Sequence, residues 1–350
     1  MATTGDTPFP EPVGIPIEDA IDLHAFAPRA VADVVTTYLA AAVEAGFREV
    51  RVVHGRGTGT QRRRVRAVLA EHPVVERYAD APPERGGHGA TLVWLRPASA
   101  AHDATVVDQF GRQALPFSDA GPIRDEAALQ LLVHLAGAGS ADRVLDVACG
   151  PGLLVRAFAR VAGLAVGVDL TPAMLARARE LATARVCWVR GHVARLPVRD
   201  GAFSIVTSRF AFHHFLDPAT VLAEMARACA PGGTVLVADA TPPPEAAAAF
   251  DHMERLRDPS HVRALPAAEL AALFRAAGLS APRTISYRLE VELEALLATS
   301  FPDPGGADAV RALFTAALAD DALGMGVHRR GERIWCAYPV TALAATVPSA

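Results

Sequence analysis

Asp146 and Asp169 each end an apolar run, and a glycine-rich turn and a helical pattern lie between them. Residues 144–152, VLDVACGPG, read as a short strand followed by a small-residue turn and a helix start. Glycines in such a turn let the backbone approach a ligand, and the helix start offers N–H groups without partners. Asp169 lies 23 residues after Asp146, where an acid can bind the two hydroxyls of a ribose. This spacing predicts a site for a nucleotide-like cofactor.

A second group of polar residues lies near the N-terminus. Asp22 and His24 end a strand-like run, and His54 opens a loop that contains Gly57 and Gly59. The backbone N–H groups of such a loop can bind a phosphate. Five arginines, with no acid among them, would suit a phosphate backbone: Arg56, Arg62, Arg63, Arg64 and Arg66. The same side chains could equally form a solvated helix face, so the residues alone leave both interpretations open.

The elements that must position the N-terminal group follow a strand, helix, strand, helix, strand order over residues 15–97. Apolar residues recur at helical spacing from Pro28 to about Ala45, and Gly46 ends that helix. Residues 48–54 alternate as a strand does, and 86–97 form the last strand. This order predicts a small α/β sandwich.

Strand and helix patterns alternate again over residues 121–342. Repeated units of this kind predict a mainly parallel sheet with helices on both faces. A ligand then binds beyond the carboxyl ends of the central strands. The residues that fall there are Asp146, Gly150, Gly152, Asp169 and His192. We interpret 241–266 and 290–331 as inserts that are long enough to cover a pocket.

Three segments are expected to lie outside these domains. Residues 1–14 read as a flexible Pro/Gly tail, and 343–350 as a second tail. Residues 98–120 are rich in Ala, Ser, Asp and Pro and read as a linker with one short helix around Gln109 and Phe110.

Composition narrows the function classes. The net charge of −4 argues against a generally basic surface for nucleic acid. The four cysteines form no C-x-x-C pair, so we expect neither a metal site nor a disulfide framework, and a reducing cytoplasm fits. No run approaches the roughly 18 apolar residues of a membrane helix. We therefore expect a cytoplasmic globular protein without a membrane partner.

Residues 15–97 resemble the Smr (small MutS-related) domain in three ordered boxes: Ile21–His24, Val50–Gly59 and Gly86–Thr91. That family is associated with DNA or RNA binding, and some members nick nucleic acid. The resemblance implies that Asp22, His24 and His54 are the active-site polar groups. It also implies that Arg56 and Gly57 to Gly59 form a phosphate loop. Many members have Gly where this chain has Ala25, and the basic patch is modest for a nuclease. We expect binding here and leave cleavage open.

Residues 105–340 resemble class I S-adenosylmethionine (SAM)-dependent methyltransferases, and in particular the type 11, ubiquinone/menaquinone-methyltransferase-like branch. Three stretches carry this likeness: the D-x-x-C-G-P-G turn, the segment 195–218 and the P-G-G entry at 231–233. A dinucleotide site is the alternative, but its G-x-G-x-x-G turn is absent and Leu153 to Val155 would crowd a pyrophosphate. The resemblance implies a Rossmann-like domain with a seven-stranded sheet.

The resemblance also assigns cofactor-binding residues. These are Asp146, Ala148, Cys149, Gly150, Gly152, Asp169, Leu170, Met174, His192, Val193 and Arg209. Gly191-His192-Val193 stands where members usually have G-D-A, which weakens a side-chain contact with the adenine but leaves the backbone N–H. Gln109 and Phe110 are expected to help cover the cofactor.

Methyl transfer needs a base only when the acceptor must lose a proton. His213 and His214 are the candidates, with one ring facing the pocket and the other the core, and Asp239 is a third. Ordinary packing of both histidines is the alternative. The sequence Ser208–Ala211 replaces the Asn/Asp-Pro-Pro-aromatic box of base-amine methyltransferases, which favours a small-molecule acceptor.

Two other functions remain open. The Smr-like segment could direct the methyltransferase to nucleic acid, as the fusion itself suggests. Alternatively, the chain is a non-catalytic nucleic-acid-binding adaptor that senses SAM.

Overall fold

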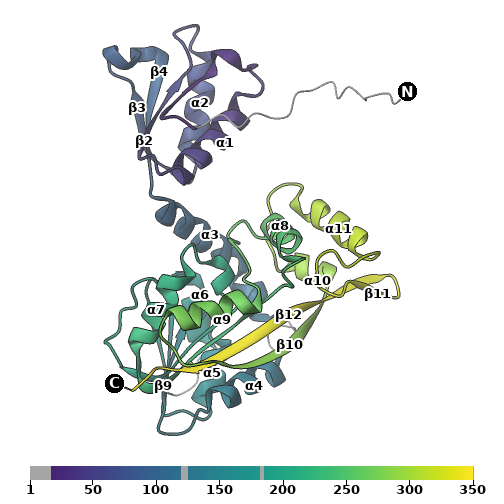
Figure 1. The fold of residues 1–350 in the computed structure, drawn as a ribbon. Helices are drawn as coiled ribbons and strands as arrows, with labels where there is room; N and C mark the ends of the chain where they lie inside the picture. Colours follow the sequence, from purple (N-terminus) through teal and green to yellow (C-terminus); the bar gives the residue numbers. More distant parts are fainter. Residues whose placement is uncertain (1–16, 120–124, 182–184, 350) are drawn as a thin grey trace, which may run out of the picture. The chain divides into compact units, whose positions relative to one another are not determined.

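A computed structural model describes residues 17–119, 125–181 and 185–349 (Figure 1). The chain divides into two units between Ala104 and Thr105, here called unit 1 and unit 2. The expected N-terminal tail at 1–14 lies outside the described residues. So do residues 120–124, where the linker was expected to end and the second domain to begin.

Unit 1 is a four-stranded sheet in the order β1-β2-β4-β3, packed against two helices. Its elements are β1 Ala20–Asp22, α1 Val31–Glu44, β2 Glu49–Val53, α2 Thr60–Glu71, β3 Val75–Asp80 and β4 Ala90–Leu95. Strand β3 was not expected, because half of its side chains are exposed and the strand shows no alternation of buried positions. The α/β sandwich is present, with one strand more than the sequence pattern indicated.

Unit 2 contains a sheet in the order β10-β12-β9-β8-β5-β6-β7, with short β11 added to β12. The strands are β5 Arg143–Val147, β6 Leu164–Asp169, β7 Val186–Arg190, β8 Phe203–Arg209, β9 Cys229–Ala240, β10 Arg283–Glu292, β11 His328–Arg330 and β12 Arg333–Thr346. Strands β5 to β9 are parallel to their neighbours among themselves, while β10, β11 and β12 pair antiparallel. The expected Rossmann-like arrangement is confirmed.

Helices cover both faces of this sheet (Figure 1). On one face lie α4 Glu126–Ala136, α5 Leu153–Ala159 and α6 Pro172–Glu180, and on the other α7 Pro218–Ala228 and α9 Ala267–Ala276. Phe158 fills the first interface and Phe274 the second, and both are fully buried. Burial of these faces fixes the carboxyl ends of β5, β6 and β8 next to one another.

The two expected inserts form a third layer of helices: α8 Ala247–Arg257, α10 Leu293–Ala298 and α11 Gly306–Ala317. They pack on the part of β10 and β12 that extends past the end of β9, around buried Phe250 and Phe314. The expected C-terminal tail is wrong in its first part, because β12 continues to Thr346. Leu343 is buried there and pairs with β9.

The expected linker is a 22-residue helix, α3 Ala98–Asp119. Its alanine-rich first half favours a helix throughout. Gln109, Gln113 and Ala114 are buried, so the part of the helix that belongs to unit 2 packs as a structural element. Composition indicated one short helix within a linker, whereas the structure has a longer helix that crosses the division between the two units.

Candidate functional site

The turn after β5 is built for close approach to a ligand. Ala148, Gly150 and Gly152 all have positive φ angles, 55°, 52° and 78°. A non-glycine residue in this region is strained, and such strain gathers at binding sites. A Cβ at Gly152 would collide with the indole ring of Trp188 on β7. Only glycine therefore fits this position.

Asp169 connects this turn to the loop after β6. Its Oδ2 atom accepts a hydrogen bond of 2.8 Å from the Gly150 N–H, and its Oδ1 atom accepts one of 2.8 Å from the Thr171 N–H. Burial raises the pKa of the carboxyl, against the lowering effect of these N–H groups. A carboxylate oxygen has a second lone pair, so each oxygen can still accept a hydrogen bond from a ligand hydroxyl.

Asp146 lies near the end of β5, just before the turn, and is buried. Thr207 donates a hydrogen bond of 2.9 Å to its Oδ1 atom. Burial raises the pKa of Asp146 to about 7, and the Arg209 guanidinium acts in the opposite direction. A ligand ammonium beside this carboxyl would favour its ionised form.

The other expected cofactor residues lie around these loops. Met174 is buried, with its sulfur 4.0 Å from the point where a Gly150 Cβ would stand, and Leu170 is half-buried. His192 Nδ1 accepts a hydrogen bond from the Ala194 N–H, so its ring supports its own loop. The thiol of Cys149 is buried, which raises its pKa well above the ordinary value. That cysteine is therefore no nucleophile.

We expect Gly152→Ala to destabilise unit 2 by about 2–4 kcal/mol, because the new methyl group meets Trp188 and φ stays positive. Urea unfolding measures the free-energy change. In a Trp188→Ala background the same substitution should cost clearly less, because the collision is gone. Equal costs in both backgrounds would show that Trp188 is not the obstacle.

A cavity of about 320 Å³ lies in unit 2 beyond the ends of β8 and β9. Strand β8 stands between β5 and β9, so the loop after β8, which lines this cavity, follows the strand next to β5. The Arg209 guanidinium, near Asp146, stacks 4.4 Å from the ring of Phe210, which lines the cavity. Its walls are Phe110, Gln113, Phe210, His213, His214, Ala240, Phe250, Glu254, Arg257, Asp258, His261, Leu289, Val291, Ala295, Leu296, Ala298, Thr299 and Tyr338.

His213 lines this cavity from the 3-10 helix Phe212–His214. Its Nδ1 atom is 2.6 Å from Asp239 Oδ1 at the end of β9. Burial disfavours the charged ring, but Asp239 outweighs this effect and the pKa of His213 is raised. The pair leaves Nε2 as the ring nitrogen for proton transfer, an arrangement common to histidine bases.

His214 lines the same cavity, contrary to the expectation that one ring of the pair faces the core. Its Nδ1 atom lies 3.0 Å from the Ser260 carbonyl oxygen, and the ring of Phe110 packs edge-on against it at 4.9 Å. Burial and the neighbouring His213 lower the pKa of His214 to about 3. The ring therefore stays neutral and is the weaker base.

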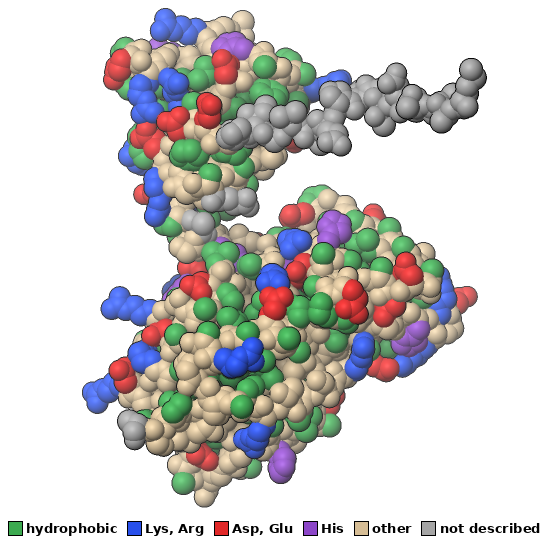
Figure 2. Space-filling model, in the orientation of Figure 1, with side chains coloured by type: hydrophobic (Ala, Val, Ile, Leu, Met, Phe, Trp, Pro, Cys, Tyr) green, Lys and Arg blue, Asp and Glu red, His purple; other side chains and the backbone are tan. Residues whose placement is uncertain are grey.

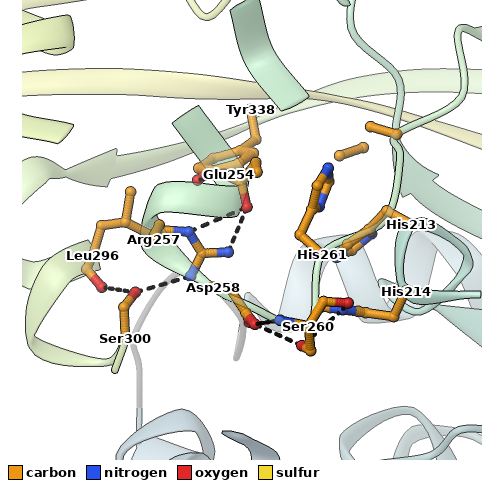
Figure 3. Close-up of polar contacts among 12 residues, drawn as sticks. His213, His214, Glu254, Arg257, Asp258, Ser260, His261, Leu296, Ser300 and Tyr338 are labelled. Atoms are coloured by element: carbon orange, nitrogen blue, oxygen red, sulfur yellow. Dashed lines mark hydrogen bonds and ion pairs between the residues drawn. The ribbon is translucent and has the colours of Figure 1, made fainter. Parts of the chain in front are cut away.

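The residues that form the opposite wall were not predicted from the sequence. His261 Nε2 is 2.7 Å from Asp251, and Glu254 binds Arg257 and the Tyr338 hydroxyl (Figure 3). Most come from α8 and the loop after it, a segment that was predicted only to be long enough to cover a pocket. The Glu254–Arg257 spacing of three residues was the available signal.

Two side chains of α3, Phe110 and Gln113, line this cavity. Gln113 Nε2 donates a hydrogen bond of 3.2 Å to Asp258 Oδ2, and Gln109 is buried beside Arg112. The structure places Phe110 at the cavity. The expectation that Gln109 and Phe110 help cover the cofactor stays a prediction.

In unit 1, Asp22 and His24 form an exposed pair. Asp22 Oδ1 accepts a hydrogen bond from the His24 backbone N–H at 2.9 Å and lies 2.5 Å from His24 Nδ1. The backbone N–H of His24 is the main cause of the lowered pKa of Asp22. His24 Nε2 is 2.6 Å from the point where a Cβ of Gly55 would stand, so glycine lets the ring pack on the loop.

His54 differs from this pair because it is buried and both ring nitrogens are occupied. Nε2 lies 2.9 Å from Thr91 Oγ1, and Nδ1 lies 3.1 Å from the Gly55 carbonyl oxygen. Burial lowers its pKa. The geometry therefore assigns His54 to holding the loop, which leaves Asp22 and His24 as the polar pair open to a ligand.

The expected basic patch is partly neutralised. Arg62 and Arg66 both bind Asp80 at 2.6 and 2.8 Å, an acid that β3 supplies from outside the arginine run. On the face drawn in Figure 2, arginines and acidic side chains alternate over unit 1. Arg63 lies at the start of α2, near Gly59, and the Arg56 guanidinium reaches Gly87. Gly57 lies in the loop between them.

Neither a metal site nor a membrane-spanning helix is found among the described residues. Over 17–119, 125–181 and 185–349, no three His, Cys, Asp or Glu side chains converge as metal ligands would. In the same ranges, every helix is too short or too polar to cross a bilayer.

Comparison with known families agrees with the two units. A family model described as a methyltransferase domain matches residues 145–237, and one described as an Smr domain matches 21–96. The uncharacterized methyltransferase YcgJ of Bacillus subtilis is 31% identical over 191 residues, which cover 53% of this chain and 76% of that protein. Its crystal structure matches with a TM-score of 0.59 and 26% identity, over 64% of this chain and 99% of that one.

The endonuclease MutS2 of Thermomicrobium roseum is 43% identical over 79 residues, 23% of this chain. Those residues make up 10% of MutS2, so the likeness is confined to its Smr region.

Proposed function

The chain belongs to the class I SAM-dependent methyltransferases and carries an Smr domain at residues 21–96, and from this premise we propose that unit 2 methylates a small molecule held in its cavity. SAM is the methyl donor in this proposal. The carrying observation is the His213–Asp239 pair in a cavity lined by the loop after β8, the strand next to β5.

The residues around the turn after β5 suit SAM. Gly150 and Gly152 keep the turn clear of side chains, and the Asp169 carboxylate can accept hydrogen bonds from both ribose hydroxyls. Asp146 suits the ammonium of the amino-acid part. Arg209 is buried near Asp146 and suits the SAM carboxylate better than the sulfonium, because like charges repel. SAM supplies a methyl group already activated on its sulfonium.

The cavity residues then hold and deprotonate the acceptor. His213 takes the proton at Nε2, while Asp239 holds Nδ1 and stabilises the protonated ring. The apolar walls exclude water and align the acceptor with the methyl group, which supplies most of the acceleration.

The proposal is tested by incubating the full chain with methyl-labelled SAM and cell extract, and separating the products into RNA, DNA, protein and small-molecule fractions. Label should enter the small-molecule fraction. Label confined to RNA or DNA would instead support methylation directed by unit 1.

Binding of DNA or RNA by unit 1 is a second proposed function, supported by the likeness to the Smr region of MutS2. The exposed Asp22–His24 pair beside the Gly55–Gly59 loop is its candidate contact site. Cleavage of nucleic acid at this pair is a further expectation from the likeness to the Smr family.

We expect Arg56→Ala with Arg63→Ala to weaken nucleic-acid binding by the full chain and to reduce its logarithmic salt slope by about 2. Arg62→Ala should change the slope much less, because Asp80 already neutralises that charge. Fluorescence anisotropy with labelled RNA and duplex DNA, at several salt concentrations, measures both. Arg311→Ala in unit 2 is the control. An unchanged slope in the double variant would remove these arginines from the interface.

A further inference from the structure

The cavity wall contains charges that are fully paired within the protein. The Arg257 guanidinium donates hydrogen bonds to Glu254 Oε2 at 2.6 and 3.1 Å and to Ser300 Oγ at 2.9 Å. Tyr338 donates to the other oxygen, Glu254 Oε1, at 2.7 Å (Figure 3). Burial opposes ionisation of Glu254, but Arg257 outweighs it and lowers the pKa to about 2. Both groups are therefore charged and already matched.

The acid beside them is matched as well. Asp258 Oδ1 accepts hydrogen bonds from the Ser260 N–H and hydroxyl at 2.9 and 2.6 Å, and Oδ2 accepts one from Gln113. Each oxygen of Glu254 and Asp258 therefore already accepts at least one hydrogen bond within the protein. The two carboxylates also outnumber the one guanidinium, so this wall repels an anion.

The histidines add no free cation. His214 stays neutral, and the His261 ring is held by Asp251. Any charge on His213 is compensated by Asp239 at 2.6 Å. Among the described residues that line the cavity, every group that is cationic near neutral pH thus has a carboxylate partner. The rest of the wall is apolar or aromatic, including Phe110, Phe210 and Phe250.

We infer that the cavity selects an uncharged, largely apolar molecule that carries one weakly acidic hydroxyl, such as a phenol or enol, and rejects anions of the same shape. Transfer of an anionic ligand into such a wall costs solvation that no unpaired cation of the wall returns. A hydroxyl has its partner in His213, and the apolar body packs on the aromatic side chains.

The reaction that follows rests on the proposed function. The acceptor O–H bond breaks and its proton goes to His213 Nε2. The oxygen forms a bond to the methyl carbon, and the electrons of the broken C–S bond return to sulfur. The products are a methyl ether, a neutral thioether and protonated His213, which then releases its proton to solvent. No oxidant or reductant is required.

The inference is tested by binding to the full chain without SAM, so that it stands apart from catalysis. Isothermal titration near neutral pH compares 1-naphthol with 1-naphthoate, which share one frame and differ in charge. We expect 1-naphthol to bind at least about tenfold more tightly than 1-naphthoate. Equal or tighter binding of the carboxylate would overturn the inference.

Glu254→Gln tests the charge argument itself. This change removes the carboxylate that neutralises Arg257 and keeps the side-chain shape, so 1-naphthoate affinity should rise about tenfold. Glu180→Gln, which alters an exposed pair with Arg177 at the same spacing of three residues, is the matched control and should change nothing. An unchanged affinity for 1-naphthoate in a folded Glu254→Gln protein would contradict the pairing argument.

Ala298→Trp tests whether 1-naphthol binds in the cavity. Ala298 is an exposed residue of the cavity wall, so a large side chain there can obstruct the cavity without entering the core. We expect at least about a tenfold loss of 1-naphthol binding. Ala316→Trp on the exposed side of α11 is the control. Unchanged 1-naphthol binding in Ala298→Trp would place the ligand elsewhere. Selective binding of 1-naphthol without any methyl transfer would leave this inference intact and defeat only the proposed function.

Discussion

Asp169→Ala should lower the affinity of the full chain for SAM about a hundredfold or more. Without the carboxylate, the ribose hydroxyls of SAM would lose two hydrogen bonds, each about 1.5–3 kcal/mol for a charged acceptor. The N–H groups of Gly150 and Thr171, which shape the two loops, would also lose their acceptor. Isothermal titration measures the change directly.

Two further proteins make this result specific. Asp308→Ala alters an exposed carboxylate on α11 and should leave SAM affinity unchanged. Circular dichroism and thermal unfolding of Asp169→Ala separate a lost contact from a lost fold. SAM affinity that survives in a folded Asp169→Ala protein would remove Asp169 from the site.

His213→Gln should lower kcat for a hydroxyl acceptor by about 10²- to 10⁴-fold and leave SAM affinity unchanged, because the base acts only on the acceptor. The raised pKa of His213 sets the pH profile. A base works in its neutral form, so the rate should rise with pH, with a midpoint above the ordinary histidine value of about 6.5.

Asp239→Asn moves that profile in a defined direction. Without the carboxylate, burial dominates and lowers the pKa of His213, so the rise in rate should shift to lower pH while the plateau falls. Steady-state rates from acid to alkaline pH measure both effects. A profile identical to the native one would show that Asp239 does not act on the base.

The turn after β5 and its neighbour Asp169 were predictable because their residue pattern is local in sequence. Ala148 to Gly152 follow a buried strand, and the acid of the second strand lies at the expected spacing. The parallel sheet then brings the two strand ends together without further information. The hydrogen bonds from Gly150 and Thr171 to Asp169 were not foreseen, because they depend on loop geometry rather than on residue type.

The acceptor cavity was largely unpredictable for the opposite reason. Its residues come from α3, the loop after β8, α8, β10, α10 and β12, which meet only in the folded unit. Glu254 and Arg257 look like an ordinary surface pair in sequence, yet their side chains are only 3% and 13% exposed. Likewise, Asp80 neutralises Arg62 across 18 residues, which no local charge count reveals.

Methylation of a small molecule in this cavity is best tested by comparing methyl transfer in the native chain, Asp169→Ala and Ala298→Trp, with labelled SAM and fractionated extract. We expect label in the small-molecule fraction for the native chain alone, with SAM binding retained in Ala298→Trp and lost in Asp169→Ala. Label in a macromolecular fraction, or undiminished transfer by Ala298→Trp, would contradict methylation of a small molecule in this cavity.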